Sequence, residues 1–136
     1  MKSITVPAVQ SELDNVRNFI NGELDNFDCS PKARFQMELA VEEIFVNIAS
    51  YAYSPSVGDA SVSCEISDDS LTASVIFSDM GKPFDPLAKE DADTSEEALL
   101  GREGGLGILM TKKVMDEVTY SYENGKNILT IKKNIK

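Results

Sequence analysis

Two pairs of strand-like segments constrain the fold of this chain more than any other feature. Residues 61–66 and 71–77 alternate apolar and polar side chains, so each segment has one apolar face. Residues 118–122 and 127–132 form a second pair, joined through an Asn-Gly dipeptide at 124–125 that is typical of tight hairpins. The pattern predicts antiparallel strands with one face buried and one face in water.

A strand-like segment at 3–8 and three segments with helical spacing complete the pattern. Apolar residues recur at three- and four-residue steps in 9–27, in 31–53 and in 106–114. The resulting order predicts a two-layer α+β sandwich, in which a mixed, mostly antiparallel sheet carries three main helices on one face. At this length we expect a single domain over residues 1–136.

Charge and residue usage exclude several functions. With 23 acidic and 13 basic residues the formal charge is -10, which argues against direct nucleic-acid binding. No apolar run reaches 18 residues and no secretory signal is visible, so we expect a cytoplasmic protein without a membrane span. Because His is absent, every mechanism that needs an imidazole is excluded. Cys29 and Cys64 are expected to be reduced core thiols.

The second predicted helix carries a narrow stripe of polar side chains between apolar ones, called the polar lane below. Ser30 can cap this helix and Pro31 suits its first position. At about 100° per residue, Glu43 and Asn47 lie one turn apart on the same side, between two apolar sectors. They are either members of a structural hydrogen-bond network or part of a site. The sectors are Met37, Val41, Ile44, Phe45, Ile48 and Ala52, and Phe35, Leu39 and Val46.

Asp79 is a charged residue in an otherwise apolar row of the predicted strand. By parity this carboxylate continues the inward-facing row that also contains Leu71, Ala73, Val75 and Phe77. It is either a turn residue that leaves the strand or an acceptor that waits for a donor. Gly81 follows, and it permits a sharp turn and the close approach of a flat ligand.

A long polar segment ends in glycines. Residues 82–103 have no sustained periodicity, and loops of this length in a compact domain are usually functional or mobile. Gly104-Gly105-Leu106-Gly107 follows at a helix start, where free backbone N–H groups can face an anion or simply form a turn. Neither a P-loop nor a Rossmann fingerprint fits these glycines. The helix after them is predicted to carry Leu106, Leu109, Met110 and Val114 on one face.

The order of these features resembles the GHKL (Bergerat-fold) ATP-binding domain of gyrase, histidine-kinase and mismatch-repair ATPases. Over nearly the whole chain the closest resemblance is to bacterial anti-sigma-factor serine kinases. Segment 42–47 resembles the N box, segment 79–84 the G1 box and segment 104–107 the G2 box.

The resemblance implies a role for each of these residues. Asn47 would coordinate Mg²⁺, Glu43 would be the general base, and Asp79 would accept a hydrogen bond from the adenine amino group. Backbone amides of the glycines would hold the phosphates, and residues 82–103 would form a lid over ATP or ADP. The implied nucleotide-binding residues are Asn47, Asp79, Gly81, Phe84, Arg102, Gly104, Gly105, Leu106 and Gly107.

Three features of the sequence depart from the family or supplement its boxes. Tyr51 stands where the family often has a His, four residues after the Mg²⁺ asparagine. The basic residues available for the phosphates are Lys82, Lys89 and Arg102, in a segment rich in Asp and Glu. Arg17 lies roughly where the family has an arginine that contacts the partner.

The implied function is the transfer of the ATP γ-phosphate to a serine of an anti-sigma-factor antagonist, together with sequestration of a sigma factor. Relatives of this type are usually dimeric, so a homodimer that pairs through residues 3–8 is also implied. Three alternatives stay open at this stage. The chain could be a non-catalytic ATP- or ADP-binding module, a detached histidine-kinase-like catalytic domain, or an acidic interaction domain without a ligand.

Overall fold

The computed structural model describes residues 1–53, 56–85 and 105–136, and only the backbone of 105–109. Its centre is a five-stranded sheet of order β1-β2-β3-β5-β4, in which every neighbouring pair is antiparallel. The sheet expected to be mixed and mostly antiparallel is therefore antiparallel throughout the described part. The strands are β1 (Lys2–Pro7), β2 (Asp59–Ser67), β3 (Thr72–Asp79), β4 (Glu117–Glu123) and β5 (Lys126–Asn134).

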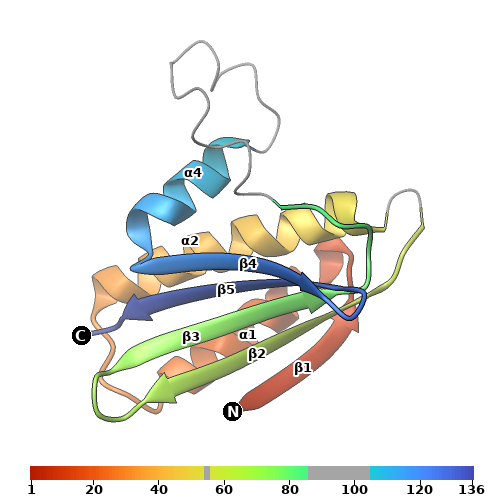
Figure 1. Cartoon of the computed structure of the whole chain (residues 1–136). Helices are drawn as coiled ribbons and strands as arrows, with labels where there is room; N and C mark the ends of the chain where they lie inside the picture. Colours follow the sequence, from red (N-terminus) through yellow and green to blue (C-terminus); the bar gives the residue numbers. More distant parts are fainter. Residues whose placement is uncertain (54–55, 86–104) are drawn as a thin grey trace.

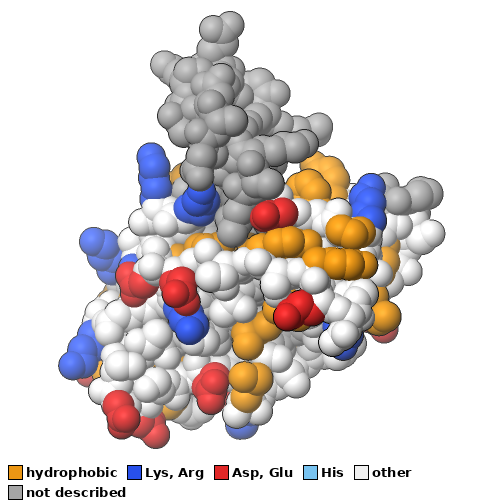
Figure 2. All heavy atoms as spheres, in the orientation of Figure 1, with side chains coloured by type: hydrophobic (Ala, Val, Ile, Leu, Met, Phe, Trp, Pro, Cys, Tyr) orange, Lys and Arg blue, Asp and Glu red, His pale blue; other side chains and the backbone are white. Residues whose placement is uncertain are grey.

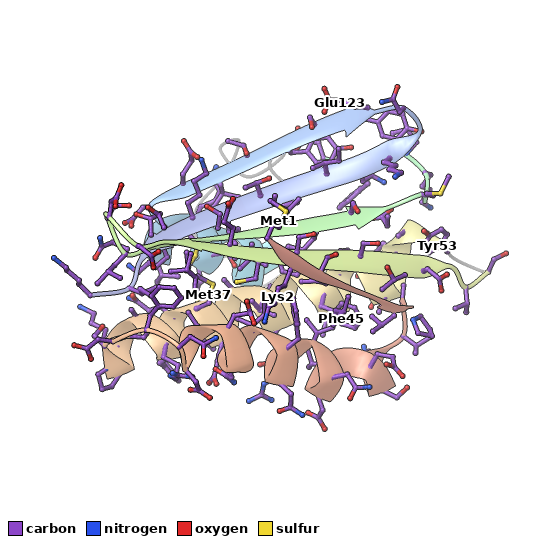
Figure 3. The ribbon with its side chains drawn as sticks, turned by 90° about the horizontal axis from the view of Figure 1, so that it is seen from below. Met1, Lys2, Met37, Phe45, Tyr53 and Glu123 are labelled. Atoms are coloured by element: carbon purple, nitrogen blue, oxygen red, sulfur yellow. The ribbon has the colours of Figure 1, made fainter. Side chains whose placement is uncertain are left out.

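The helices cover one face of this sheet, as predicted (Figure 1). A view turned by 90° shows the two layers, with Met37 and Phe45 in the space between them (Figure 3). No helix in the described ranges is long and apolar enough to cross a membrane. The helical elements are η1 (Gln10–Glu12), α1 (Leu13–Leu24), α2 (Pro31–Asn47), the π-helix η2 (Ile48–Ala52) and α4 (Gly105–Val114).

The core lies between the sheet and the helices α1 and α2. The inward rows of β2 and β3 are buried as the alternation predicts, and the first apolar sector of α2 packs against them. The largest side chains that are fully buried are Phe45, Phe77, Ile20, Leu24, Met37, Ile44, Ile131 and Ile135.

The cysteines are free thiols, as expected. Cys64 lies in the core, where burial raises the pKa of its thiol to about 11. Cys29 is half-buried and packs against the core from outside. Neither sulfur is in a setting that favours the reactive thiolate.

Three local predictions were wrong. Leu71 belongs to the turn before β3 rather than to the strand, and its backbone has φ 49°. Met110, predicted on the same apolar face of α4 as Val114, is 50% exposed, whereas Val114 packs against the core. The continuous helix over 31–53 changes at Ile48 into the π-helix η2.

The start of α2 provides a test of the predicted cap. The Ser30 Oγ accepts a hydrogen bond of 3.1 Å from the Ala33 backbone N–H, and Pro31 occupies the first helical position. A Ser30→Ala variant should lose about 1 kcal/mol of unfolding free energy, measured by urea denaturation, because one N–H of the first turn loses its acceptor. Ser56→Ala, outside the helices, is the matched control, and equal stability of both variants would contradict this role of Ser30.

Candidate functional site

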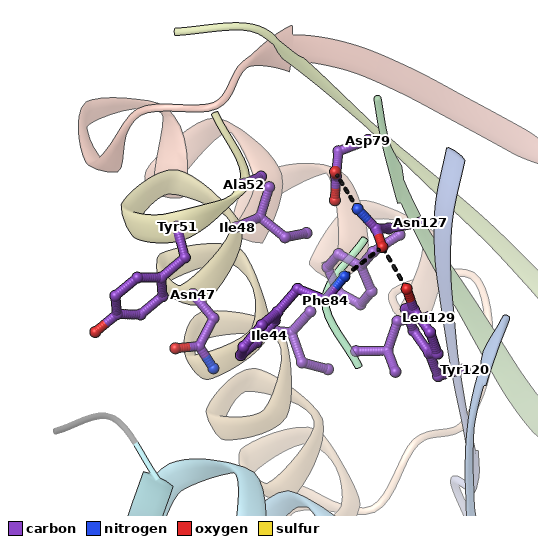
Figure 4. A pocket seen from close by; sticks show the side chains of 11 residues that line it. Ile44, Asn47, Ile48, Tyr51, Ala52, Asp79, Phe84, Tyr120, Asn127 and Leu129 are labelled. Carbon is purple, nitrogen blue, oxygen red and sulfur yellow. Dashed lines mark hydrogen bonds between the residues drawn. The ribbon is translucent and has the colours of Figure 1, made fainter. Parts of the chain in front are cut away.

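A cavity opens between the C-terminal end of α2 and the sheet. Figure 4 shows Asn47 and Tyr51 on the helical side, with Asp79 and Asn127 on the strands opposite. Asn47 and Asp79, which the sequence analysis assigned to one site, therefore line the same cavity. The lining residues are Ile44, Asn47, Ile48, Tyr51, Ala52, Phe77, Asp79, Phe84, Tyr120, Asn127 and Leu129.

The floor of the cavity is polar at Asp79, the last residue of β3. This side chain is only 6% exposed, and its Oδ1 accepts hydrogen bonds from the Gly81 N–H at 2.9 Å and from the Asn127 amide at 3.0 Å. Its Oδ2 makes no hydrogen bond to another described residue. In the described part, every fully buried side-chain oxygen has a hydrogen-bond partner. Because Asp79 lines the cavity, Oδ2 is available to accept from a ligand that carries an N–H donor.

Gly81 lies against the π-helix η2. A Cβ at this position would lie 2.2 Å from the backbone oxygen of Ala52, and the same oxygen accepts a hydrogen bond of 3.1 Å from the Lys82 N–H. Only glycine permits this approach, because the Ala52 backbone atoms cannot move aside as the end of a flexible side chain can. The predicted glycine is thus required for contact between two parts of the protein.

Tyr53, just beyond η2, also holds the segment after Asp79 in place through hydrogen bonds. Its hydroxyl donates to the Asp59 carbonyl at 2.6 Å and accepts from the Met80 N–H at 2.7 Å. Burial is the main cause that raises the pKa of Tyr53 above its ordinary value. The phenol therefore stays protonated at neutral pH, as the donor role requires.

Asn127, at the start of β5, was missed in the sequence. It is buried, lies opposite Asp79 in the register of β3 and β5, and donates to the Asp79 carboxylate. The place of Asn127 in the strand alternation was informative. Asn127 continues the buried row of Leu129 and Ile131 in β5, and Asp79 continues the buried row of β3 in the same way. A polar residue in an inward row on each of two strands is the signal that could have found it.

Asn47 and Glu43 lie one turn apart near the end of α2. The Asn47 side chain lines the cavity, whereas Glu43 is half-buried and lies outside the lining. Burial, followed by repulsion from Glu42, raises the pKa of the Glu43 carboxyl. The second apolar sector beside this lane is not core, since Phe35 and Leu39 are 61% and 39% exposed.

The chain matches the histidine kinase-like ATPase domain over residues 6–133. It belongs to this family. The predicted resemblance to GHKL domains is thereby confirmed. Among curated relatives, the serine-protein kinase RsbW of Staphylococcus epidermidis is 29% identical over 133 residues, which are 93% of this chain and 82% of that protein.

Solved structures agree on the fold. The blue-light activated histidine kinase of Erythrobacter litoralis matches with a TM-score of 0.54 and 17% identity over 79% of this chain. This chain spans only 32% of that longer kinase. The histidine kinase AdeS of Acinetobacter baumannii matches with a TM-score of 0.53 and 16% identity, over 99% of this chain and 69% of the other.

Two aromatic side chains border the cavity of this ATPase domain. The rings of Tyr51 and Phe84 have their centroids 6.4 Å apart and are tilted by 32°, and both rings line the cavity and are partly exposed. Hydrophobic side chains gather across the upper part of the described surface (Figure 2). Tyr51 thus contributes an aromatic ring to the cavity lining.

The predicted phosphate loop is only partly described. Gly105, Leu106 and Gly107 form the first turn of α4, as the glycine pattern predicted. Gly104 lies outside the described residues, as do residues 86–103 of the predicted lid, which include Lys89 and Arg102. Of the predicted lid, the structure describes residues 82–85, and Lys82 is tied to the end of η2 through its backbone N–H.

Proposed function

We propose that this domain binds Mg-ATP in the cavity between α2 and the sheet and transfers the γ-phosphate to a serine of another protein. One observation carries the proposal. Asn47 and Asp79 come from distant stretches of the chain, belong to two different sequence boxes, and line one cavity. The serine kinase name of the curated relatives supports the class of acceptor.

The described lining suits an adenine. Its walls are mainly apolar or aromatic, through Ile44, Ile48, Phe77 and Leu129, and the open oxygen of Asp79 provides one acceptor at the floor. Small-molecule sites have this composition, in which a few polar groups fix the orientation of a ligand held by apolar contacts. The exocyclic amino group of adenine is a donor that the carboxylate can recognise.

The residues present also fit a magnesium ion. Mg²⁺ prefers oxygen ligands and usually takes only one or two from the protein, and the Asn47 amide offers such an oxygen at the cavity. No cluster of three or more acidic, Cys or His side chains that could hold a metal occurs among the described residues. When bound, the ion would neutralise phosphate charge.

In the proposed reaction Glu43 is the general base. The serine oxygen forms a bond to the γ-phosphorus, the bond from phosphorus to the ADP oxygen breaks, and Glu43 takes the hydroxyl proton. The raised pKa of Glu43 makes it a better proton acceptor than an exposed carboxylate while leaving it ionised above that pKa. Backbone N–H groups at the start of α4, including those of Gly105 and Gly107, are proposed to hold the phosphates.

The proposed partners follow the anti-sigma-factor type of kinase. The acceptor serine belongs to an antagonist protein, and the same domain would sequester a sigma factor, without direct contact to nucleic acid or membrane. Arg17 on α1 is the proposed partner-contacting residue, and a homodimer could form along the free edge of β1. We place the protein in the cytoplasm.

An Asp79→Asn variant tests the adenine site. Calorimetric titration of wild-type protein should detect Mg-ATP binding, and the variant should bind at least 10-fold more weakly, because it replaces a charged acceptor by an amide. Asp69→Asn makes the same change in the exposed turn between β2 and β3 and should bind like wild type. Equal affinity of Asp79→Asn and wild type would count against this site.

The product of the reaction separates the alternatives. Incubation with labelled ATP and candidate antagonist proteins should yield acid-stable phosphoserine. Acid-labile label would favour a histidine-kinase-like catalytic domain. Binding of ATP without any transfer would favour a non-catalytic module.

A further inference from the structure

The side chain of Asn127 has no hydrogen-bonding capacity to spare. Its Nδ2 donates to the Asp79 Oδ1 at 3.0 Å, to the Lys82 carbonyl at 2.8 Å and, more weakly, to the Gly81 carbonyl at 3.4 Å. Its Oδ1 accepts from the Phe84 N–H at 3.1 Å and from the Tyr120 hydroxyl. Two donors and two acceptor positions are the complete inventory of an amide, so none is left for a ligand.

The orientation of this amide is fixed by its neighbours. The backbone N–H of Phe84 can only donate, so the atom that faces it must be oxygen. The carbonyl of Lys82 can only accept, so the atom that faces it must be nitrogen. Neither a carboxylate nor a hydroxyl offers donors and acceptors in this arrangement. The site therefore requires an amide, and Asn127 is short enough to provide it from the strand.

This one side chain holds both ends of segment 79–84. It reaches the carboxylate of Asp79 at the start, the backbone of Lys82 in the middle and the backbone of Phe84 at the end. The two ends carry groups that line the cavity: the Asp79 acceptor and the Phe84 ring. Figure 4 shows the chain of hydrogen bonds from Asp79 through Asn127 to Phe84 and Tyr120.

We infer that Asn127, supported by the Tyr120 hydroxyl, is a positioning residue that sets the base selectivity of the cavity. It holds Oδ1 of Asp79 on the protein side, which leaves Oδ2 aimed at the ligand, and it fixes the shape of the segment that carries the Phe84 ring. This inference rests on the proposed function in so far as the ligand is an adenine nucleotide. We call the hydrogen bonds from Asn127 to Asp79, Lys82 and Phe84 the clamp. The clamp is present in the protein without ligand.

The first arm of the test measures the clamp without nucleotide. In an Asn127→Leu variant, which keeps a similar shape, the Phe84 amide should exchange with solvent at least 10-fold faster by residue-resolved hydrogen exchange. The Met80 amide should keep its protection, because Tyr53 holds it. Unchanged protection at Phe84 would overturn the clamp, and equal loss at both amides would show general loosening and would overturn it too.

The second arm measures selectivity, as the ratio of the dissociation constants for ITP and ATP. ITP carries an oxygen in place of the adenine amino group, so wild type should prefer ATP. The preference should fall at least fivefold in Asn127→Leu. It should fall about threefold in Tyr120→Phe. This variant loses only one hydroxyl and is therefore expected to disturb folding less than Asn127→Leu does. Tyr122→Phe makes the same change on an exposed residue of β4 and should keep the wild-type ratio.

The outcomes separate the two ideas. If wild type binds neither nucleotide, the proposed function fails, while the exchange arm still tests the clamp. If wild type prefers ATP and both Asn127→Leu and Tyr120→Phe keep its preference, the selectivity role of Asn127 is wrong and the proposed function stands.

Discussion

Replacing Glu43 by Gln is expected to lower the rate of phosphotransfer at least 100-fold while the affinity for Mg-ATP stays within about twofold. A positioned general base contributes about 10²–10⁴-fold, and Gln cannot take a proton. Glu43 lies outside the residues that line the cavity, so its loss should leave nucleotide binding intact. The measurement is a single-turnover rate with labelled ATP and the acceptor protein, next to a titration with Mg-ATP.

Glu42→Gln is the matched control, since Glu42 is the exposed neighbour that also raises the pKa of Glu43. It should retain most of the activity. The rate in wild type should rise with pH through a pKa above that of an ordinary glutamate, and in Glu42→Gln this rise should move to lower pH. A Glu43→Gln variant that transfers phosphate at the wild-type rate would refute the assignment of the base.

The same pKa shift predicts that Glu43→Gln stays folded. A raised pKa means that the folded state binds the proton more tightly than the unfolded chain does. The stability from this proton is complete below the unfolded pKa and is lost as the pH rises through the folded pKa. At neutral pH the ionised Glu43 therefore costs folding free energy. The neutral Gln avoids that cost, so we expect the variant to be no less stable than wild type at neutral pH.

A Gly81→Ala variant is expected to lose about 1–3 kcal/mol of unfolding free energy and to bind Mg-ATP at least 10-fold more weakly. Its Cβ would lie 2.2 Å from the Ala52 backbone oxygen and 2.6 Å from the Ala52 backbone carbon, so the π-helix or the segment after Asp79 must move. Either movement disturbs a wall of the cavity, because Ala52 and Asp79 both line it. Urea denaturation and calorimetry measure the two effects.

Gly22→Ala is the control for this change. Gly22 lies within α1, and a Cβ there would meet no atom within 4 Å. Alanine is the better helix former, so this variant should gain about 0.5–1 kcal/mol. A Gly81→Ala variant as stable as wild type and equally able to bind ATP would show that the close contact is not needed.

Local patterns in the sequence predicted much of the fold. Alternation located β2 and β3 and the inward position of Asp79, and Ser30 with Pro31 located the start of α2. These features depend on neighbours within a few residues, which is why the sequence alone could reveal them. The polar lane at Glu43 and Asn47 was predicted in the same way.

Features that depend on distant contacts were not predicted. Asn127 becomes a partner of Asp79 only because β5 inserts between β3 and β4, which periodicity does not reveal. The π-helix η2 ends where Ala52 meets Gly81 and Lys82, so tertiary contacts accompany its departure from the α-helix. Phe35 and Leu39 look like core from spacing alone, yet no described element buries them.

The placement of β5 also bears on how the protein is made. This strand occupies the interior of the sheet, yet the ribosome produces it after every other described element. Until it emerges, β3 lacks its β5 neighbour and Asp79 lacks the side-chain donor of Asn127. We expect a nascent chain to complete the cavity only once β5 has been made, because Asn127 and Leu129 of this strand line it.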